Sequence, residues 1–156
     1  MRLFRIVTVS IGLWAMAAVA VADESAVVKP STQSVEALWE RVGDFCGIGS
    51  WHPGVAKCQL SADKRTRTLT LKDGGTLVEH LVKWNDETHS YTYTIVAGSW
   101  PLTNYAATLE VAPAESGAGA VLHWNSHYTP RSATDSNAKT LVEDFYRAGL
   151  AGLGGN

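Results

Sequence analysis

An arginine and a glutamate in neighbouring strand-like segments are the residues of this sequence best suited to chemistry. In the alternating segment 66–72, Arg67 falls on the same face as Leu69, and in segment 76–84, Glu79 falls on the same face as Leu81. Unpaired charges among apolar side chains are costly, so we expect the two to pair or to line a wet cavity. An arginine can hold an anionic or carbonyl oxygen while a glutamate moves a proton. The alternative is a structural ion pair that fixes the register of the strands.

The turn between these two segments decides which residues face each other. Asp73-Gly74-Gly75 is typical of a tight hairpin turn. A turn centred on Gly74 places Leu69 opposite Glu79 and Arg67 on the diagonal, within reach of its long side chain. Tyr105, on the apolar side of a later strand, is a third candidate, as a hydrogen-bond donor.

The spacing of apolar residues predicts an α+β fold. Helical spacing is present at 34–45 and, over a longer stripe, at 138–153. Between them we expect an antiparallel sheet, because the strands follow one another without crossover helices. A curved sheet around the final amphipathic helix would enclose space. About seven strands are expected, at 26–29, 56–60, 66–72, 76–84, 90–96, 104–112 and 120–129.

Length and composition favour one globular domain. The chain has 156 residues, of which 46% are hydrophobic, and this is too apolar for disorder. Its 13 Lys and Arg against 15 Asp and Glu offer no polycationic surface, which argues against nucleic acid as a partner. Six Trp, five Tyr and three Phe indicate a large core or an aromatic-lined cavity.

Residues 1–22 have the features of a cleaved export signal. Arg2 and Arg5 precede an apolar stretch that ends in the small-residue site Ala20-Val21-Ala22. The alternative is a retained membrane anchor, for which the apolar stretch is at the short limit. Cleavage leaves a single domain at 23–156 without a membrane anchor, changes the net charge from −2 to −4, and predicts a periplasmic or secreted protein.

The two cysteines have two interpretations. In an oxidising compartment Cys46 and Cys58 can form a disulfide. The alternative is that they are two small apolar side chains that never meet.

Metal and cofactor sites have little support in the sequence. On a strand, His123 and His127 would lie about 13 Å apart, too far to share one ion. His52 follows Trp51 in a loop, where packing is at least as good an explanation as proton transfer. The glycines near the C-terminus follow no strand and open no helix, unlike a dinucleotide-binding loop. We therefore expect no metal and no cofactor.

An ordered set of short motifs resembles the polyketide cyclase/dehydrase branch of the SRPBCC (START-like) superfamily over nearly all of residues 23–156. The motifs are Val42-Gly43-Asp44-Phe45, Trp51-His52-Pro53-Gly54-Val55, Arg67-Thr68-Leu69-Thr70-Leu71, Glu79-x-Leu81, Ser90-Tyr91-x-Tyr93, Tyr105-x-Ala107-Thr108-Leu109 and Phe145-Tyr146-Arg147-Ala148-Gly149-Leu150. The resemblance implies a helix-grip fold with a hydrophobic cavity between sheet and helix. Similarity to the plant lachrymatory factor synthase implies functional roles for Arg67, Glu79 and Tyr105. The exported start and the Trp-His-Pro segment are more similar to MxaD-like periplasmic proteins associated with methanol oxidation.

Three functions are compatible with this resemblance. The first is binding of a small apolar or aromatic molecule, by inward-facing residues that we expect to be Trp51, Leu69, Leu81, Tyr93, Leu109, Trp124, Tyr128 and Phe145. The second is a cofactor-free cyclase, dehydratase or isomerase that uses Glu79, Arg67 and Tyr105. The third is an accessory role beside a periplasmic quinoprotein (methanol) dehydrogenase. Trp100-Pro101-Leu102 would then contact a partner or an entering ligand, or would simply fold over the cavity.

Overall fold

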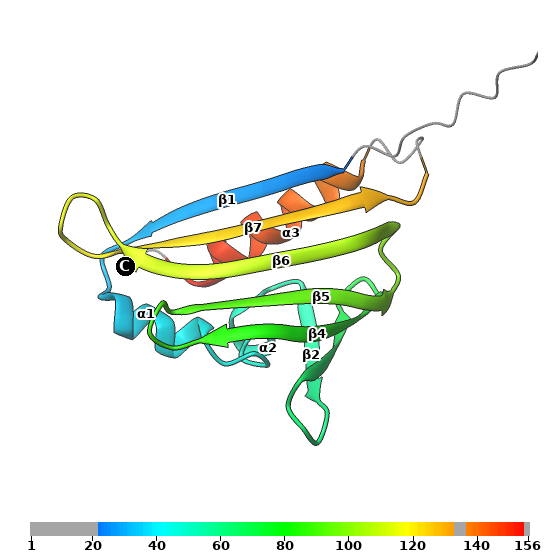
Figure 1. Ribbon diagram of the computed structural model, residues 1–156, viewed down its shortest axis with the longest axis horizontal. Helices are drawn as coiled ribbons and strands as arrows, with labels where there is room; N and C mark the ends of the chain where they lie inside the picture. Colours follow the sequence, from blue (N-terminus) through cyan, green and yellow to red (C-terminus); the bar gives the residue numbers. More distant parts are fainter. Residues whose placement is uncertain (1–21, 133–136, 155–156) are drawn as a thin grey trace, which may run out of the picture.

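Seven antiparallel strands form one curved sheet (Figure 1), in the order β1-β7-β6-β5-β4-β3-β2. The computed structural model describes residues 22–132 and 137–154, so the predicted export signal lies, apart from Ala22, outside the described residues. The sheet confirms the predicted α+β class and strand number. The strands are β1 (Asp23–Ser31), β2 (Val55–Leu60), β3 (Thr66–Leu71), β4 (Thr76–Asn85), β5 (Ser90–Gly98), β6 (Leu102–Pro113) and β7 (Ala120–Pro130).

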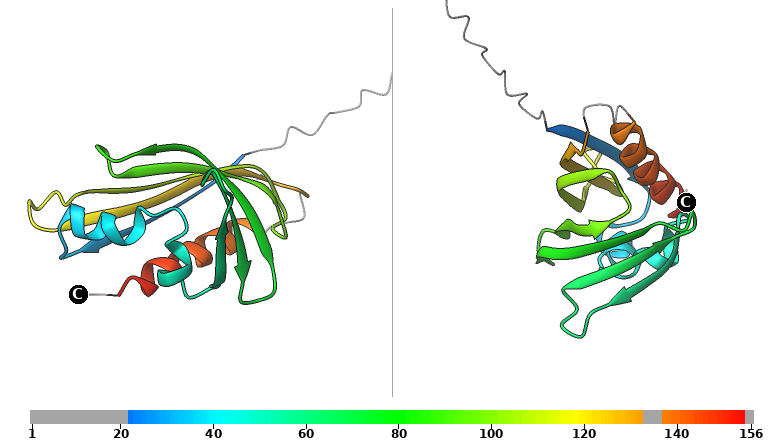
Figure 2. Two further views of the ribbon diagram at one scale, coloured as in Figure 1. Left: turned by 90° about the horizontal axis from the view of Figure 1, so that it is seen from below. Right: turned by 90° about the vertical axis from the view of Figure 1, so that its right-hand side faces the viewer.

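Three helices lie on the concave side of the sheet (Figure 2). They are α1 (Val35–Val42), α2 (Ile48–Trp51) and α3 (Ala138–Gly152). Ser34 caps α1 by accepting a hydrogen bond from the Ala37 N–H at 3.2 Å. The predicted first helix ends earlier than expected, and α2 was not predicted because a single turn is too short to show a helical period. Within the described residues, no helix is long and apolar enough to cross a membrane.

The hairpin between β3 and β4 pairs Arg67 with Glu79 and Leu69 with Leu77. The expectation that Leu69 faces Glu79 is therefore wrong by two residues. The turn is centred on Asp73 rather than on Gly74, since the Leu71 N–H donates to the Gly75 carbonyl at 2.8 Å. Gly74 adopts a φ of 91°, which suits glycine, and Asp73 accepts a hydrogen bond from the Gly75 N–H. This register places the two charged side chains directly opposite each other.

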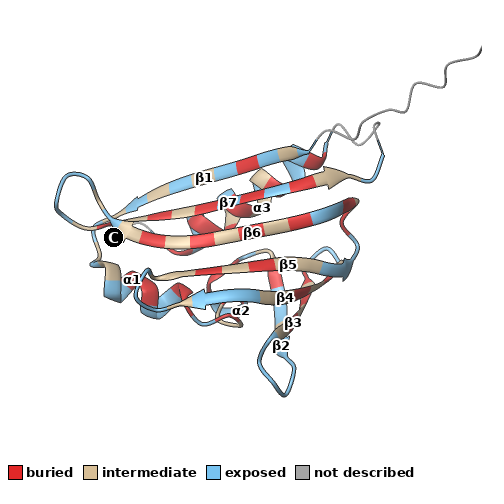
Figure 3. Cartoon of the chain, viewed as in Figure 1, coloured by how far each residue is buried: buried red, intermediate tan, exposed pale blue. Residues whose placement is uncertain are grey.

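Buried and exposed residues alternate along the strands (Figure 3). On β7, Trp124, Ser126 and Tyr128 are buried, whereas Asn125 and His127 are exposed, as the sequence predicts. The concave face of the sheet is thus the apolar face, and α3 covers it (Figure 2).

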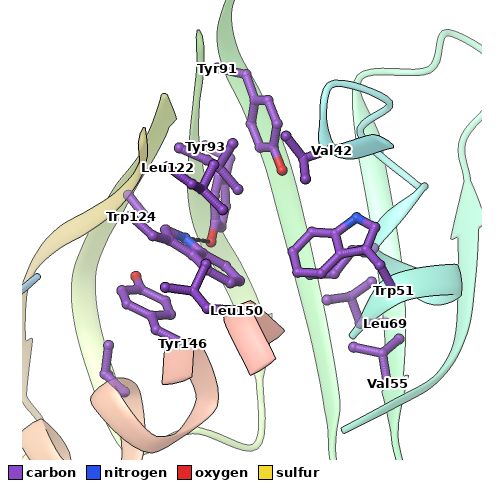
Figure 4. Packing of buried hydrophobic residues seen from close by; sticks show 14 of the residues in the cluster. Val42, Trp51, Val55, Leu69, Tyr91, Tyr93, Leu122, Trp124, Tyr146 and Leu150 are labelled. Carbon is purple, nitrogen blue, oxygen red and sulfur yellow. Dashed lines mark hydrogen bonds between the residues drawn. The ribbon is translucent and has the colours of Figure 1, made fainter. Parts of the chain in front are cut away.

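Aromatic side chains fill the space between the sheet and α3. Trp124 stacks on Tyr146 of α3 with ring centroids 4.2 Å apart, and Trp51 meets Trp124 edge-on at 5.8 Å. Figure 4 shows Tyr93, Trp124 and Tyr146 on one side of this core and Trp51 on the other. Where the sequence predicts a cavity, the structure has this aromatic core.

Candidate functional site

Arg67 on β3 and Glu79 on β4 form a buried ion pair. The Nε of Arg67 lies 2.6 Å from Oε2 of Glu79, and the side chains are 0% and 3% exposed. The register of the hairpin directs both toward the concave face. The structure therefore brings together the two residues that the sequence singles out.

The guanidinium of Arg67 is enclosed by aromatic rings. Its Cζ lies 4.1 Å from the ring centroid of Phe45 and 4.9 Å from that of Tyr93. Its Nη1 donates a hydrogen bond to the Phe45 carbonyl. Nη2 finds no hydrogen-bond partner among the described residues. One nitrogen of a fully buried cation thus lacks an acceptor at hydrogen-bonding distance in the described residues, although Arg67 lies close enough to Tyr91 to oppose the rise that burial causes in the pKa of this tyrosine.

The two charges affect each other's pKa. Burial acts to lower the pKa of Arg67, but Glu79 and the neighbouring tyrosines outweigh burial and raise it, so Arg67 stays cationic. Burial raises the pKa of Glu79 above its ordinary value, and Arg67 opposes that shift. A carboxyl group with a raised pKa is closer to the range in which an acid or base works at neutral pH.

Tyr105 belongs to a second group of polar side chains in the core. In the described residues it makes no hydrogen bond to Arg67 or Glu79. Its hydroxyl is hydrogen-bonded to the hydroxyl of Tyr146 on α3. Nearby, Trp124 Nε1 donates to the Tyr93 hydroxyl at 3.0 Å. Burial raises the pKa of Tyr105, Tyr93 and Tyr146, so all three hydroxyls remain protonated. Tyr93, which contacts both Arg67 and Tyr105, connects the two groups.

The residues predicted to contact a ligand differ in how far they are buried. Leu81 and Phe145 are only partly buried. The fully buried members are Trp51, Leu69, Tyr93, Leu109, Trp124 and Tyr128.

A groove of about 360 Å³ runs along the surface above the core, bordered by Trp100 and Phe145. The Trp100 ring is buried and lies 5.1 Å from Phe145 and 6.1 Å from Tyr105, measured between ring centroids. The loop that carries Trp100 therefore folds over the core, one of the two interpretations that the sequence allows. Tyr105 lies next to the Trp100 ring, so Trp100 lies between the groove and the polar group that contains Tyr105.

His52 joins its loop to α3. Its Nδ1 accepts a hydrogen bond from the Gly54 N–H at 3.0 Å, and its Nε2 donates to the Phe145 carbonyl at 2.9 Å. The ring stacks on Phe145 with centroids 3.9 Å apart. Burial lowers the pKa of His52 to about 4, so the ring is neutral at pH 7. These contacts favour packing over proton transfer as the role of His52.

A disulfide joins Cys46 to Cys58, whose Cα atoms are 5.7 Å apart. It attaches the loop between α1 and α2 to strand β2. No group of three or more His, Cys, Asp or Glu side chains among residues 22–132 and 137–154 is placed to hold a metal ion.

Several functional candidates escaped the sequence analysis. The helical spacing at 34–45 includes Phe45 in the apolar stripe, but α1 ends at Val42, and nothing in the spacing indicates that Phe45 in the following loop contacts Arg67. Tyr91 shares its face with Tyr93, and Tyr146 lies on the apolar stripe of the last helix, so alternation and helical spacing could have identified both. Four buried polar atoms find no partner among the described residues: Trp51 Nε1, Arg67 Nη2, Tyr91 Oη and Ser126 Oγ. Each can donate a hydrogen bond, so the core is suited to accept an oxygen atom.

Comparison with known proteins identifies a matching family. The family model described as "Polyketide cyclase / dehydrase and lipid transport" matches residues 24–155. Among curated proteins, none matches this chain.

Solved structures with the same fold cover most of the chain. XoxI from Bacillus cereus is 29% identical with a TM-score of 0.79, over 83% of this chain and 92% of that chain. An uncharacterized protein from Bacillus thuringiensis is 30% identical with a TM-score of 0.79, over 84% and 96%. Ginseng major latex-like protein 151 from Panax ginseng is 14% identical with a TM-score of 0.70, over 85% and 95%, which shows a shared fold alone.

Proposed function

Because the chain belongs to the polyketide cyclase/dehydrase and lipid transport family, we propose that it binds a small apolar or aromatic molecule through Arg67 and the surrounding aromatic side chains. The observation that carries the proposal is the set of buried donors that have no hydrogen-bond partner among residues 22–132 and 137–154, above all Arg67 Nη2 and Tyr91 Oη. A buried donor left unpaired costs about 1–3 kcal/mol, and more when it is charged. An oxygen atom of a bound molecule would recover part of that cost.

The groove beside Trp100 and Phe145 supports the same proposal. Its size falls in the range of small-molecule sites, and its border includes the aromatic rings of Trp100 and Phe145. A ligand would reach the ion pair by displacing the Trp100 and Phe145 rings, which close the core on that side. Leu141, on the exposed side of α3, forms part of the groove wall.

Native mass spectrometry of gently purified protein tests the proposal. We expect an organic adduct at one copy per chain. A library of apolar compounds should also change the fluorescence of the buried tryptophans in a saturable way. Protein that is free of any adduct and whose fluorescence responds to no compound would contradict binding.

A matched pair of variants tests the route. Leu141→Lys, in the groove, should slow ligand uptake. Val28→Lys replaces a residue of β1 that is 58% exposed and outside the groove, and it should leave uptake unchanged. Equal uptake rates in the two variants would argue against entry through the groove.

A cofactor-free proton-transfer reaction is a second candidate, favoured by the position of Glu79. Its carboxyl group has a raised pKa and lies beside a cation that can hold an oxygen as negative charge develops. If Glu79 moves protons, a bound carbonyl compound in D₂O should exchange the hydrogens next to its carbonyl. Glu79→Gln should stop this exchange. Equal exchange rates in the variant and the wild type would leave binding as the sole proposal.

We also propose that the protein works outside the cytoplasm. The Cys46–Cys58 disulfide supports this, because disulfides persist mainly in oxidising compartments. The N-terminal sequence of protein isolated from its native cell should begin at Asp23. An N-terminus at Met1 would contradict export by signal cleavage.

A further inference from the structure

The interior of the protein carries no net charge. Of the residues that the structure describes, the buried charged side chains are Arg67 and Glu79, which neutralise each other. His52 is also buried, but it is neutral because burial lowers its pKa to about 4. A charged ligand would therefore bring an uncompensated charge into an apolar core, which is energetically unfavourable.

The donors of Arg67 are largely committed to protein partners. Nε donates to Glu79 and Nη1 to the Phe45 carbonyl, while the rings of Phe45 and Tyr93 cover the guanidinium. A carboxylate or phosphate is usually held by two parallel N–H bonds from neighbouring nitrogens. Here Nη2 is the nitrogen that has no partner in the described ranges, whereas Nε and Nη1 are both engaged. This arrangement favours a single oxygen acceptor.

Phe45 holds the guanidinium in this orientation, and a covalent link holds Phe45. The next residue, Cys46, is bonded to Cys58 of β2. Cys58 is paired with Leu69, two residues from Arg67 along β3. The loop that covers Arg67 is thus fixed to the sheet beside it.

Tyr91 supplies a second donor at the same place. Its ring centroid lies 5.8 Å from that of Phe45 and 6.0 Å from that of Tyr93, the two rings that enclose Arg67. Its hydroxyl has no partner at hydrogen-bonding distance in the described residues, and Arg67 is near enough to oppose the rise that burial causes in the pKa of Tyr91.

We infer that the ligand of this site is a neutral molecule that presents one carbonyl or hydroxyl oxygen to Nη2 of Arg67, next to the hydroxyl of Tyr91. This inference rests on the proposed function and specifies the chemical class of ligand. It separates neutral ketones, aldehydes, alcohols and phenols from carboxylates and phosphates.

Three probes of nearly equal shape test this inference. Acetophenone carries a neutral carbonyl oxygen, benzoate carries a carboxylate in its place, and α-methylstyrene carries a CH₂ group in its place. Dissociation constants are measured at pH 7 by NMR titration of the wild-type protein. We expect acetophenone to bind on the order of tenfold more tightly than either other probe, the ratio for a hydrogen bond to a charged donor.

The outcomes separate the inference from the proposed function. Equal or tighter binding of benzoate would overturn the neutral class but leave binding in place. Equal binding of acetophenone and α-methylstyrene would overturn the oxygen contact alone. If none of the three binds, the inference fails, whereas the proposed function fails only if the protein also carries no adduct and responds to no compound of the apolar library.

Variants locate the contact. Arg67→Lys keeps a cation beside Glu79 but lacks Nη2, so it should remove the preference for acetophenone over α-methylstyrene. Tyr91→Phe removes a hydroxyl that has no hydrogen-bond partner in the part of the chain that the structure describes, so it should fold normally and reduce the preference several-fold. Thr108→Val is the control: it removes a hydroxyl from the outer face of β6. It should leave the dissociation constants of acetophenone and α-methylstyrene unchanged. An undiminished preference in both Arg67→Lys and Tyr91→Phe would overturn the inference.

Discussion

Arg67 and Glu79 face each other across β3 and β4, with Nε of the arginine 2.6 Å from Oε2 of the glutamate. Neither charge has water to stabilise it, so each depends on the other. The attraction within a buried pair is largely cancelled by the cost of removing both groups from water. We therefore expect the pair to contribute to the register of the hairpin more than to stability.

Removing one member of the pair should be much worse than removing both. We expect Arg67→Met and Glu79→Leu each to lower the free energy of unfolding by about 3–5 kcal/mol, because each leaves a buried charge unpaired. The double variant should lose far less than the sum of the two single losses. Urea unfolding of the four proteins in a double-mutant cycle measures the coupling.

An exposed ion pair supplies the control for this cycle. Arg147 lies 2.6 Å from Glu143 on the surface of α3, and its side chain is 59% exposed. Arg147→Ala should cost less than about 1 kcal/mol because water replaces the lost contact. Additive losses for Arg67 and Glu79 would show that these two side chains do not depend on each other.

The hydroxyls of Tyr105 and Tyr146 form a second coupled pair. Each satisfies the other across the boundary between β6 and α3. Tyr105→Phe or Tyr146→Phe should each cost about 1–3 kcal/mol, because the remaining hydroxyl loses this partner in the core. The double variant should lose less stability than the sum of the two single losses. Thermal unfolding followed by near-UV circular dichroism measures the stability of each variant. If the double variant loses the full sum, the hydroxyl contact does not couple the two elements.

Local patterns in the sequence account for much of the fold. Alternation along a strand is a property of the backbone, so it predicts that Arg67 and Glu79 point into the core without knowledge of the rest of the chain. Their direct pairing could not be predicted in the same way. It depends on a turn centred on Asp73 rather than Gly74, and both centres are compatible with Asp73-Gly74-Gly75.

The parts of the site that the sequence did not predict depend on tertiary contacts. The sequence indicates Tyr105 as a hydrogen-bond donor in the same interior as Arg67 and Glu79. Its hydroxyl is hydrogen-bonded to that of Tyr146, and the position of α3 over the sheet decides that contact. The role of Phe45 depends on where its loop crosses β3. The aromatic core likewise depends on how the side chains interlock, which composition alone does not specify.

Gly149 is required by the close approach of His52 to α3. A methyl group at this position would lie 2.6 Å from Cδ2 of His52 and 3.0 Å from the Trp124 ring. Ala is normally the better helix former by about 1 kcal/mol, but here we expect Gly149→Ala to destabilise the fold by about 1–3 kcal/mol. Urea unfolding in the wild-type and His52→Ala backgrounds tests this cause. The loss should shrink when His52 is absent, and an equal loss in both backgrounds would rule out the His52 clash.

His52 should make stability depend on pH. Burial lowers its pKa from 6.5 to about 4, so between these values the unfolded chain binds a proton that the folded chain excludes. Stability is therefore greatest above pH 6.5 and falls as the pH approaches 4, by up to about 3 kcal/mol. The raised pKa of Glu79 acts in the opposite direction, so the comparison is made against His52→Asn, which retains Glu79. In urea unfolding, the advantage of the wild type over this variant should shrink by about 2 kcal/mol between pH 7 and pH 4.5. An advantage that stays constant with pH would mean that His52 is protonated as easily in the folded protein as in the unfolded chain.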